Sequence, residues 1–333
     1  MITKIRDKAK LFFESNGYPK SNNELWKYTD TKNFSNCNST PTKTNKTDLD
    51  YIQTLEGCTN IILYNGFNHS YLDSFSGFDI KSYNEILNSS NSEDYFLKIS
   101  KVDNSSVVSH NTSSFTDALH ITIHSDLDTP INIINISDGL KSNEIIFPRI
   151  YVHAKSNTNS KIFIKNIGIN SKCAINSVTE IYLEDNSSLE VIHISDFKQQ
   201  EAIDSIYFHQ NKNSKVKFLS STFGGKLYRS NINIDIDGSN CENISGILIL
   251  GRDKDHIDYH TNINHISEHS RSDVTCRSLL KDNSKGIFNG KIFVSNDAFG
   301  SDATLNNNNL LLSKKAQMQS NPQLEINCED VKC

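Results

Sequence analysis

The chain has 333 residues, a hydrophobic share of 36% and a formal net charge of −5. A chain of this length can bury a sizeable core, and its mildly acidic balance provides no basic field for nucleic acid or an anionic membrane. No apolar run approaches the roughly 18 residues that span a bilayer, and the N-terminus lacks a signal-peptide pattern, so the sequence predicts a cytoplasmic protein with no membrane partner. Seven irregularly spaced cysteines do not form a disulfide framework.

Residues 1–34 predict a helical N-terminal segment. Ile2, Ile5 and Ala9 recur at helical spacing, which indicates a short amphipathic helix over residues 2–14.

The single tryptophan of the chain, Trp26, stands between leucine and lysine, and such a residue is typical of a packing anchor. Residues 35–50 are polar and poor in large apolar groups, as expected of a linker. Residues 51–110 predict a mixed α/β lead-in, with a strand over 61–64 and a helix over 83–97.

Residues 111–333 predict one strand after another. Between 231 and 237 isoleucine alternates with polar residues, so Ile234 and its neighbouring isoleucines face a core while Asp235 and Asp237 face solvent.

A weak internal repeat runs through this region. The turn residues Ser160, Ser187, Ser214 and Asn240 follow one another at steps of 27, 27 and 26 residues, whereas the turn at Ser284 lies 44 residues beyond Asn240. A period of 20–30 residues without helices between the strands predicts a stacked β-solenoid of some eight coils, whose later coils fall out of step. An antiparallel β-sandwich remains the alternative.

Three side chains form a candidate metal-binding site. His256, Asp258 and His260 would project from one face of a strand, and imidazole and carboxylate groups are common metal ligands. A polar outer face without a metal is the competing interpretation.

Two further patterns concern chemistry. Asp235 and Asp237 are typical of β-helical proteins that act on carbohydrates, although a solvated face would show the same pattern. The sequence contains no phosphate-binding loop, so it predicts no ATP site.

The cysteines do not form a self-contained cluster site. Cys328 and Cys333 are the one close pair, and five positions along a strand place them on opposite faces. Any iron–sulfur cluster would therefore need ligands from a second subunit.

Two groups of residues resemble one known family in order and spacing. The first group is Gly17, Pro19, Glu24, Trp26, Lys27, Tyr28 and Thr29; the second is Asp258, Thr261, His265, Phe288, Gly290, Ile292, Ala298, Asp302, residues 309–313, Pro322, Leu324, Glu325, Ile326, Asp330, Val331 and Cys333. Together they resemble the SufB/SufD family, and more closely its SufD branch. Phe299 stands where the family usually has glutamine, and Glu329 where it usually has aspartate.

The resemblance implies a mainly β protein: a right-handed parallel β-helix over residues 111–333, preceded by a small helical N-terminal region. It implies a scaffold subunit without catalytic residues, acting with a SufB-like paralogue and a SufC-type ATPase. An iron–sulfur cluster would be assembled transiently on the complex and not on this chain alone.

The family motif that opens at Asp330 continues beyond Cys333 into a cluster-associated histidine and a helical tail that docks the ATPase. The chain ends at Cys333, so both features are expected to be absent and Cys333 is the one candidate cluster residue. The alternatives are a carbohydrate-active β-helix that uses Asp235 and Asp237, and a metal-binding module built on His256, Asp258 and His260.

Overall fold

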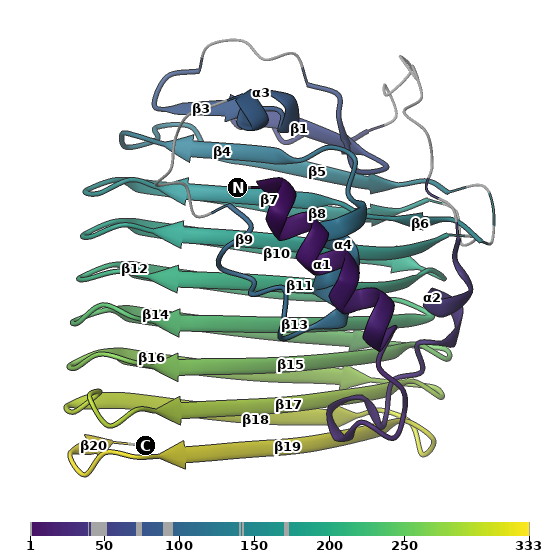
Figure 1. Ribbon diagram of the computed structural model, residues 1–333. Coiled ribbons are helices and arrows are strands. Elements are labelled where there is room, and N and C mark those ends of the chain that lie inside the picture. The colour runs from purple at the N-terminus through teal and green to yellow at the C-terminus, as the bar shows by residue number, and fades with distance from the viewer. Residues whose placement is uncertain are drawn as a thin grey trace.

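The computed structural model describes residues 2–38, 40, 52–70, 75–88, 96–139, 141, 143–169 and 173–332. Two long sheets lie face to face and form a parallel β-solenoid of about seven coils (Figure 1). The predicted fold class is confirmed: the protein is mainly β, with a parallel β-helix core and a few N-terminal helices. The antiparallel sandwich is wrong, because successive coils pair in parallel.

The strands form two sheets, and the strands of each sheet are given below in the order in which they lie side by side. Sheet I consists of β2 (Phe67–Asn68), β1 (Thr59–Tyr64), β5 (Ile131–Ser137), β8 (Asn159–Gly168), β10 (Ser188–Lys198), β12 (Lys215–Gly224), β14 (Glu242–Gly251), β16 (Arg271–Leu280), β18 (Ser301–Leu311) and β20 (Val331–Lys332). Sheet II consists of β3 (Phe78–Lys81), β4 (Leu119–Ile123), β7 (Arg149–Ala154), β9 (Ala174–Leu183), β11 (Glu201–Gln210), β13 (Leu227–Ile236), β15 (His256–His265), β17 (Lys285–Val294) and β19 (Gln317–Ile326), with β6 (Ile145–Ile146) beside β9.

The helices precede most of the solenoid in the chain. They are α1 (Ile2–Asn16), the 3-10 helix η1 (Glu24–Trp26), α2 (Lys32–Asn36), α3 (Tyr83–Asn88) and α4 (Ser106–Ser114). The helix predicted over 2–14 is confirmed. Of the helix predicted over 83–97, the structure describes a helix over Tyr83–Asn88; residues 89–95 lie outside the described residues, and Leu97 lies in a turn with a φ of 64°. Helix α4 was missed because its sequence is mostly polar and lacks a clear helical stripe.

The strands stay in parallel register to the end of the solenoid, although the coils lengthen. Lys215 pairs with Glu242 27 positions later, Glu242 with Arg271 29 positions later, and Arg271 with Asp302 31 positions later. The gap of 44 residues between Asn240 and Ser284 therefore does not mark a loss of register, because the two residues lie at different corners. Asn240 leads from sheet II into sheet I with a left-handed φ of 58°, whereas Ser284 leads from sheet I into sheet II.

Inward-facing and outward-facing side chains alternate along the strands, and the inward-facing apolar ones fill the interior of the solenoid. In β13 the isoleucines at 232, 234 and 236 are buried in the main core, and Asp235 is partly exposed on the outer face. The predicted assignment of the two faces is therefore confirmed.

The N-terminal region covers part of the outer face of sheet II. Helix α4 packs on β9, and α1 packs on α4, as Figure 1 shows. A second apolar cluster fills the space between, with Tyr18, Trp26 and Phe34 from the N-terminal segment and Tyr182 and Ile203 from the sheet. Within the described residues, no helix is long and apolar enough to cross a membrane.

A carboxylate at one corner links stability to pH. Glu184 accepts hydrogen bonds from Lys155 Nζ at 2.9 Å and from the backbone nitrogen of Ser156 at 3.0 Å, and His153 Nε2 lies 2.8 Å away. Burial alone would raise the pKa of Glu184, but these partners hold it at about 2. Because the folded pKa lies below the unfolded value, this stabilisation is present above roughly pH 4.5 and is lost as the pH falls through 2.

We therefore expect Glu184→Gln to lower the free energy of unfolding by about 1–2 kcal/mol at pH 7 and by roughly half as much at pH 3, where the folded state still carries the ionised carboxylate. Urea denaturation at both pH values measures this difference. Glu190→Gln is the control, since Glu190 pairs with the part-exposed Lys161 at 3.4 Å and such surface pairs contribute about 0–1 kcal/mol. An equal loss for Glu184→Gln at both pH values would contradict the prediction.

Candidate functional site

The N-terminal segment is anchored to sheet II through Asp258. Arg229, one strand away in β13, donates from Nη1 to Asp258 Oδ2 at 3.0 Å and to the carbonyl of Leu25 at 2.7 Å. The guanidinium carbon of Arg229 lies 3.7 Å from the ring centroid of Trp26. Thr29 Oγ1 donates to Asp258 Oδ2 at 2.5 Å. The residues of the N-terminal motif therefore bind a buried ion pair, and the predicted role of Trp26 as a packing anchor is confirmed.

The three candidate metal ligands lie on one outer face of β15, as predicted. Their contacts, however, surround the Arg229–Asp258 ion pair: His260 Nε2 lies 3.0 Å from Asp258 Oδ1, and His256 Nε2 lies 3.4 Å from Thr29 Oγ1. Burial lowers the pKa of both histidines. Burial would raise the pKa of Asp258, but Arg229 and the hydrogen bonds from His260 and Thr29 hold it below its usual value. Among the described residues, no three His, Cys, Asp or Glu side chains are arranged to hold a metal ion.

A second buried ion pair fixes helix α4 and the turn that precedes it. Arg149 Nη2 lies 2.5 Å from Glu180 Oε2, and both side chains are fully buried. Glu180 also accepts from the backbone nitrogens of Leu97 and Ser100, at 3.0 and 2.8 Å. Arg149 donates to Asn111 Oδ1 in α4 at 3.2 Å. The pair thus fixes both the turn after residue 96 and helix α4 to sheet II.

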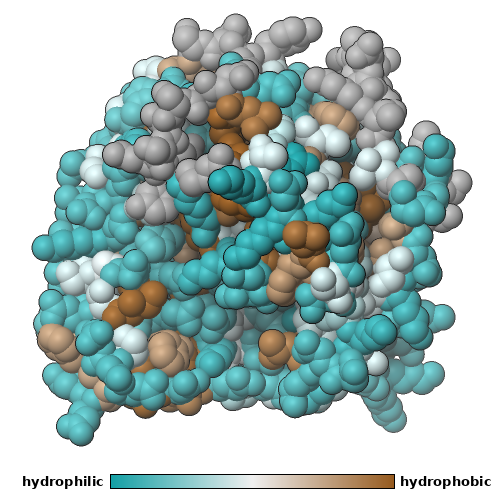
Figure 2. All heavy atoms as spheres, in the orientation of Figure 1, coloured by the Kyte–Doolittle hydropathy of each residue, from teal (hydrophilic) through white to brown (hydrophobic). Residues whose placement is uncertain are grey.

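A polar groove of about 440 Å³ lies beside this anchored segment. Its floor is the outer face of sheet II, on the largely hydrophilic side of the molecule in Figure 2. Asp235 lines the groove and accepts from Asn264 at 2.7 Å, whereas Asp237 lies beyond the strand, 3.5 Å from His209. The two carboxylates do not line one cleft, so the paired-carboxylate interpretation has no geometric support here.

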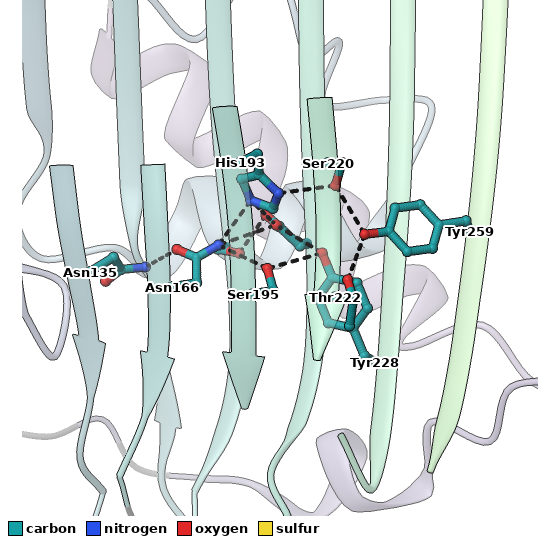
Figure 3. Close-up of polar contacts among 10 residues, drawn as sticks. Asn135, Asn166, His193, Ser195, Ser220, Thr222, Tyr228 and Tyr259 are labelled. Atoms are coloured by element: carbon teal, nitrogen blue, oxygen red, sulfur yellow. Dashed lines mark hydrogen bonds and ion pairs between the residues drawn. The ribbon is translucent and has the colours of Figure 1, made fainter. Parts of the chain in front are cut away.

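Inside the solenoid, a polar network joins the two sheets (Figure 3). Asn166 Nδ2 lies 2.9 Å from His193 Nε2, which lies 2.9 Å from Asp204 Oδ2. His193 Nδ1 lies 3.2 Å from Ser220 Oγ, and Ser220 Oγ lies 2.9 Å from the Tyr259 hydroxyl. Sheet I supplies the asparagine, the histidine and the serine, and sheet II supplies the aspartate and the tyrosine.

The order Ser220, His193, Asp204 is that of a nucleophile, a base and an orienting carboxylate. All three side chains are at most 1% exposed, so no substrate can reach the serine. Their hydrogen bonds instead hold the two sheets together in the core. Sequence reasoning missed this network, although the 27-residue step from β10 to β12 places His193 and Ser220 in register; Asn166 is in register with Ser195, two positions beyond His193.

Each of the six described cysteines is free, with no disulfide among them. Burial raises the pKa of Cys276 to about 12 and that of Cys173 to about 11, so both thiols are protonated at neutral pH. Cys241 is also buried, and its Sγ lies 2.9 Å from the Asn211 carbonyl. The candidate Cys333 lies outside the described residues.

The last coil exposes positions that are core positions elsewhere. In β19, Leu324 and Ile326 have the register of the buried Ile292 and Val294, yet they are 55% and 39% exposed. Strand β19 is the edge of sheet II, and β18 is paired by β20 at two positions near its start. Within the described part of the chain, this end of the solenoid therefore presents both apolar side chains and an unpaired strand edge.

The fold and the N-terminal anchor define a β-solenoid with a docked helical segment. A family model described as "SUF system FeS cluster assembly, SufBD core domain" matches residues 135–333, and the chain belongs to this family. The chain is 26% identical over 252 residues to an iron–sulfur cluster assembly SufBD family protein of Synechocystis sp., covering 70% of this chain and 54% of that relative. It is 32% identical over 114 residues to the iron–sulfur cluster assembly protein SufD of Escherichia coli, covering 34% of this chain and 27% of that relative. The chain thus spans about half or less of these relatives.

Proposed function

We propose that this chain is a non-catalytic, cytoplasmic scaffold subunit in iron–sulfur cluster assembly. In this proposal it pairs with a SufB-like paralogue and works with a SufC-type ATPase, and the cluster is cargo assembled on the complex. Membership of the SufBD family and the names of the relatives support the role in assembly. The absence of a phosphate-binding loop from the sequence supports a separate ATPase as the source of energy.

The observation that carries the proposal is the match of the SufBD core family model to residues 135–333, and the last described coil offers a surface for the pairing. Covering Leu324 and Ile326 would remove apolar surface from water, at about 25 cal/mol per Å². The free edge of β19 would supply backbone hydrogen bonds with a defined register. A second β-solenoid offers both features, so a paralogue fits this end in shape and in chemistry.

Mixing the chain with a SufB-like protein is expected to give a defined heterodimer, whereas the chain alone self-associates through the exposed edge. Size-exclusion chromatography with light scattering measures both states. Leu324→Lys should weaken the pairing at least tenfold, because it places a charge where apolar surface is covered. Leu11→Lys, at a 65% exposed position of α1, is the control and should leave the pairing unchanged. If the chain is a monodisperse monomer and does not bind the SufB-like protein, the proposed pairing is wrong.

A further inference from the structure

An apolar row of side chains crosses the outer face of sheet I. Phe223 in β12 pairs in register with Leu250, Leu250 with Leu279, and Leu279 with Leu310. Because neighbouring strands lie about 4.8 Å apart, these four side chains follow one another at that spacing. We call these four residues the apolar ladder.

The ladder is open to solvent. Phe223, Leu279 and Leu310 are 45%, 39% and 56% exposed. The ladder's first three residues line a cavity of about 420 Å³ together with the 56% exposed Leu312. Helix α4 packs on sheet II, and none of the described helices packs on the ladder strands. An apolar surface of this kind usually marks an interaction site.

The rim of the cavity is mainly cationic. Arg252 and Lys281 line it, against one carboxylate, that of Asp196. Arg277 lies two positions before Leu279 on the same outer face of β16. Among the described residues, neither Arg277 nor Lys281 is in an ion pair, and Arg252 reaches only the neighbouring Asp253, at 4.0 Å.

We propose that the apolar ladder binds an amphipathic helix of a partner protein, with acidic side chains flanking the helix's apolar stripe. A helix turn of 5.4 Å closely matches the strand spacing of about 4.8 Å, so apolar residues at i, i+4, i+7 and i+11 meet successive rungs. The cationic rim complements acidic flanks. If the ladders of two copies of the chain packed against each other, their cationic rims would meet, and the repulsion between like charges disfavours such a dimer. This site uses outward side chains of sheet I and does not depend on the pairing proposed at the last coil.

A synthetic 18-residue helix tests the proposal. The probe carries leucines at i, i+4, i+7 and i+11, glutamates beside them and a fluorescent label, and its binding to the whole chain is followed by fluorescence anisotropy. We expect saturable binding that weakens at least tenfold with Leu279→Ser or Leu310→Ser. Lys281→Glu should weaken it and reduce its dependence on salt.

Ile244→Ser is the matched control. Ile244 is 44% exposed on the same outer face, but it lies six residues before Leu250 in β14, roughly 20 Å away. This variant should bind the probe like the unmodified chain. The thermal midpoint of each variant shows whether it is folded. Because two separate ladder positions are substituted, the test still stands if one of these variants does not fold.

Several results would overturn the proposal. A shuffled peptide of the same composition, or one with lysine flanks, could bind equally well. The ladder variants could bind the probe unchanged. Phosphatidylserine vesicles could bind in a Leu279-dependent manner while the helix does not, which would make the ladder a lipid site. Sedimentation could show a dimer that Leu279→Ser dissociates while the helix does not bind, which would make the occupant a second copy of the chain.

Discussion

Replacing Ile234 by aspartate is expected to lower the free energy of unfolding by roughly 4 kcal/mol or more. Ile234 is fully buried, in register with Phe208 on one side and Ile263 on the other. A carboxylate at this position would lie in the apolar interior with no cation or donor to compensate it, and it would also remove the packing of one rung of the core.

The adjacent position provides the control. Asp235 lies on the outer face, and its Oδ1 accepts from Asn264 Nδ2 at 2.7 Å. Asparagine retains an acceptor there, so Asp235→Asn should change the stability by no more than about 0.5 kcal/mol. Urea denaturation at pH 7 compares the two variants. Equal losses would mean that the faces of β13 are wrongly assigned.

The faces of β13 could be predicted because alternation is a local property of the sequence. The corners could not, since Asn240 and Ser284 both follow strands and look alike, although they turn the chain between the sheets in opposite directions. The same local information placed His256, Asp258 and His260 on one face, but it could not reveal what covers that face.

The partners of Asp258 come from distant parts of the chain. Arg229 is its register neighbour in the preceding coil, 29 positions earlier, and Thr29 arrives from the N-terminal segment. Applying the 27-residue step of the earlier coils to Asp258 leads to Asn231, because the coil between Arg229 and Asp258 is two residues longer, so the sequence alone did not point to this ion pair. The contact with Thr29 has no sequence signal either, because it depends on the path of the N-terminal segment across sheet II.

This buried pair leads to the second prediction. Asp258→Ala is expected to destabilise the protein by roughly 3–5 kcal/mol and to release the N-terminal segment from sheet II. The substitution leaves the guanidinium of Arg229, which is 2% exposed, without its carboxylate. Burial lowers the pKa of Arg229 to about 10 even with Asp258 present, so the unpaired cation would be costly. Thr29 would lose its acceptor at the same time.

Trp26 reports this change directly, because it is the only tryptophan of the chain and stacks on Arg229. In Asp258→Ala its emission should shift to the red and acrylamide should quench it more strongly, at temperatures where circular dichroism shows an intact solenoid. The double variant Arg229→Met/Asp258→Leu should recover more than half of the lost stability, because replacing both charges by apolar groups leaves neither of them unpaired. If Trp26 stays shielded in Asp258→Ala and the loss is below about 1 kcal/mol, the apolar cluster around Tyr18 and Phe34 would be enough to hold the segment, and the ion pair would not be its anchor.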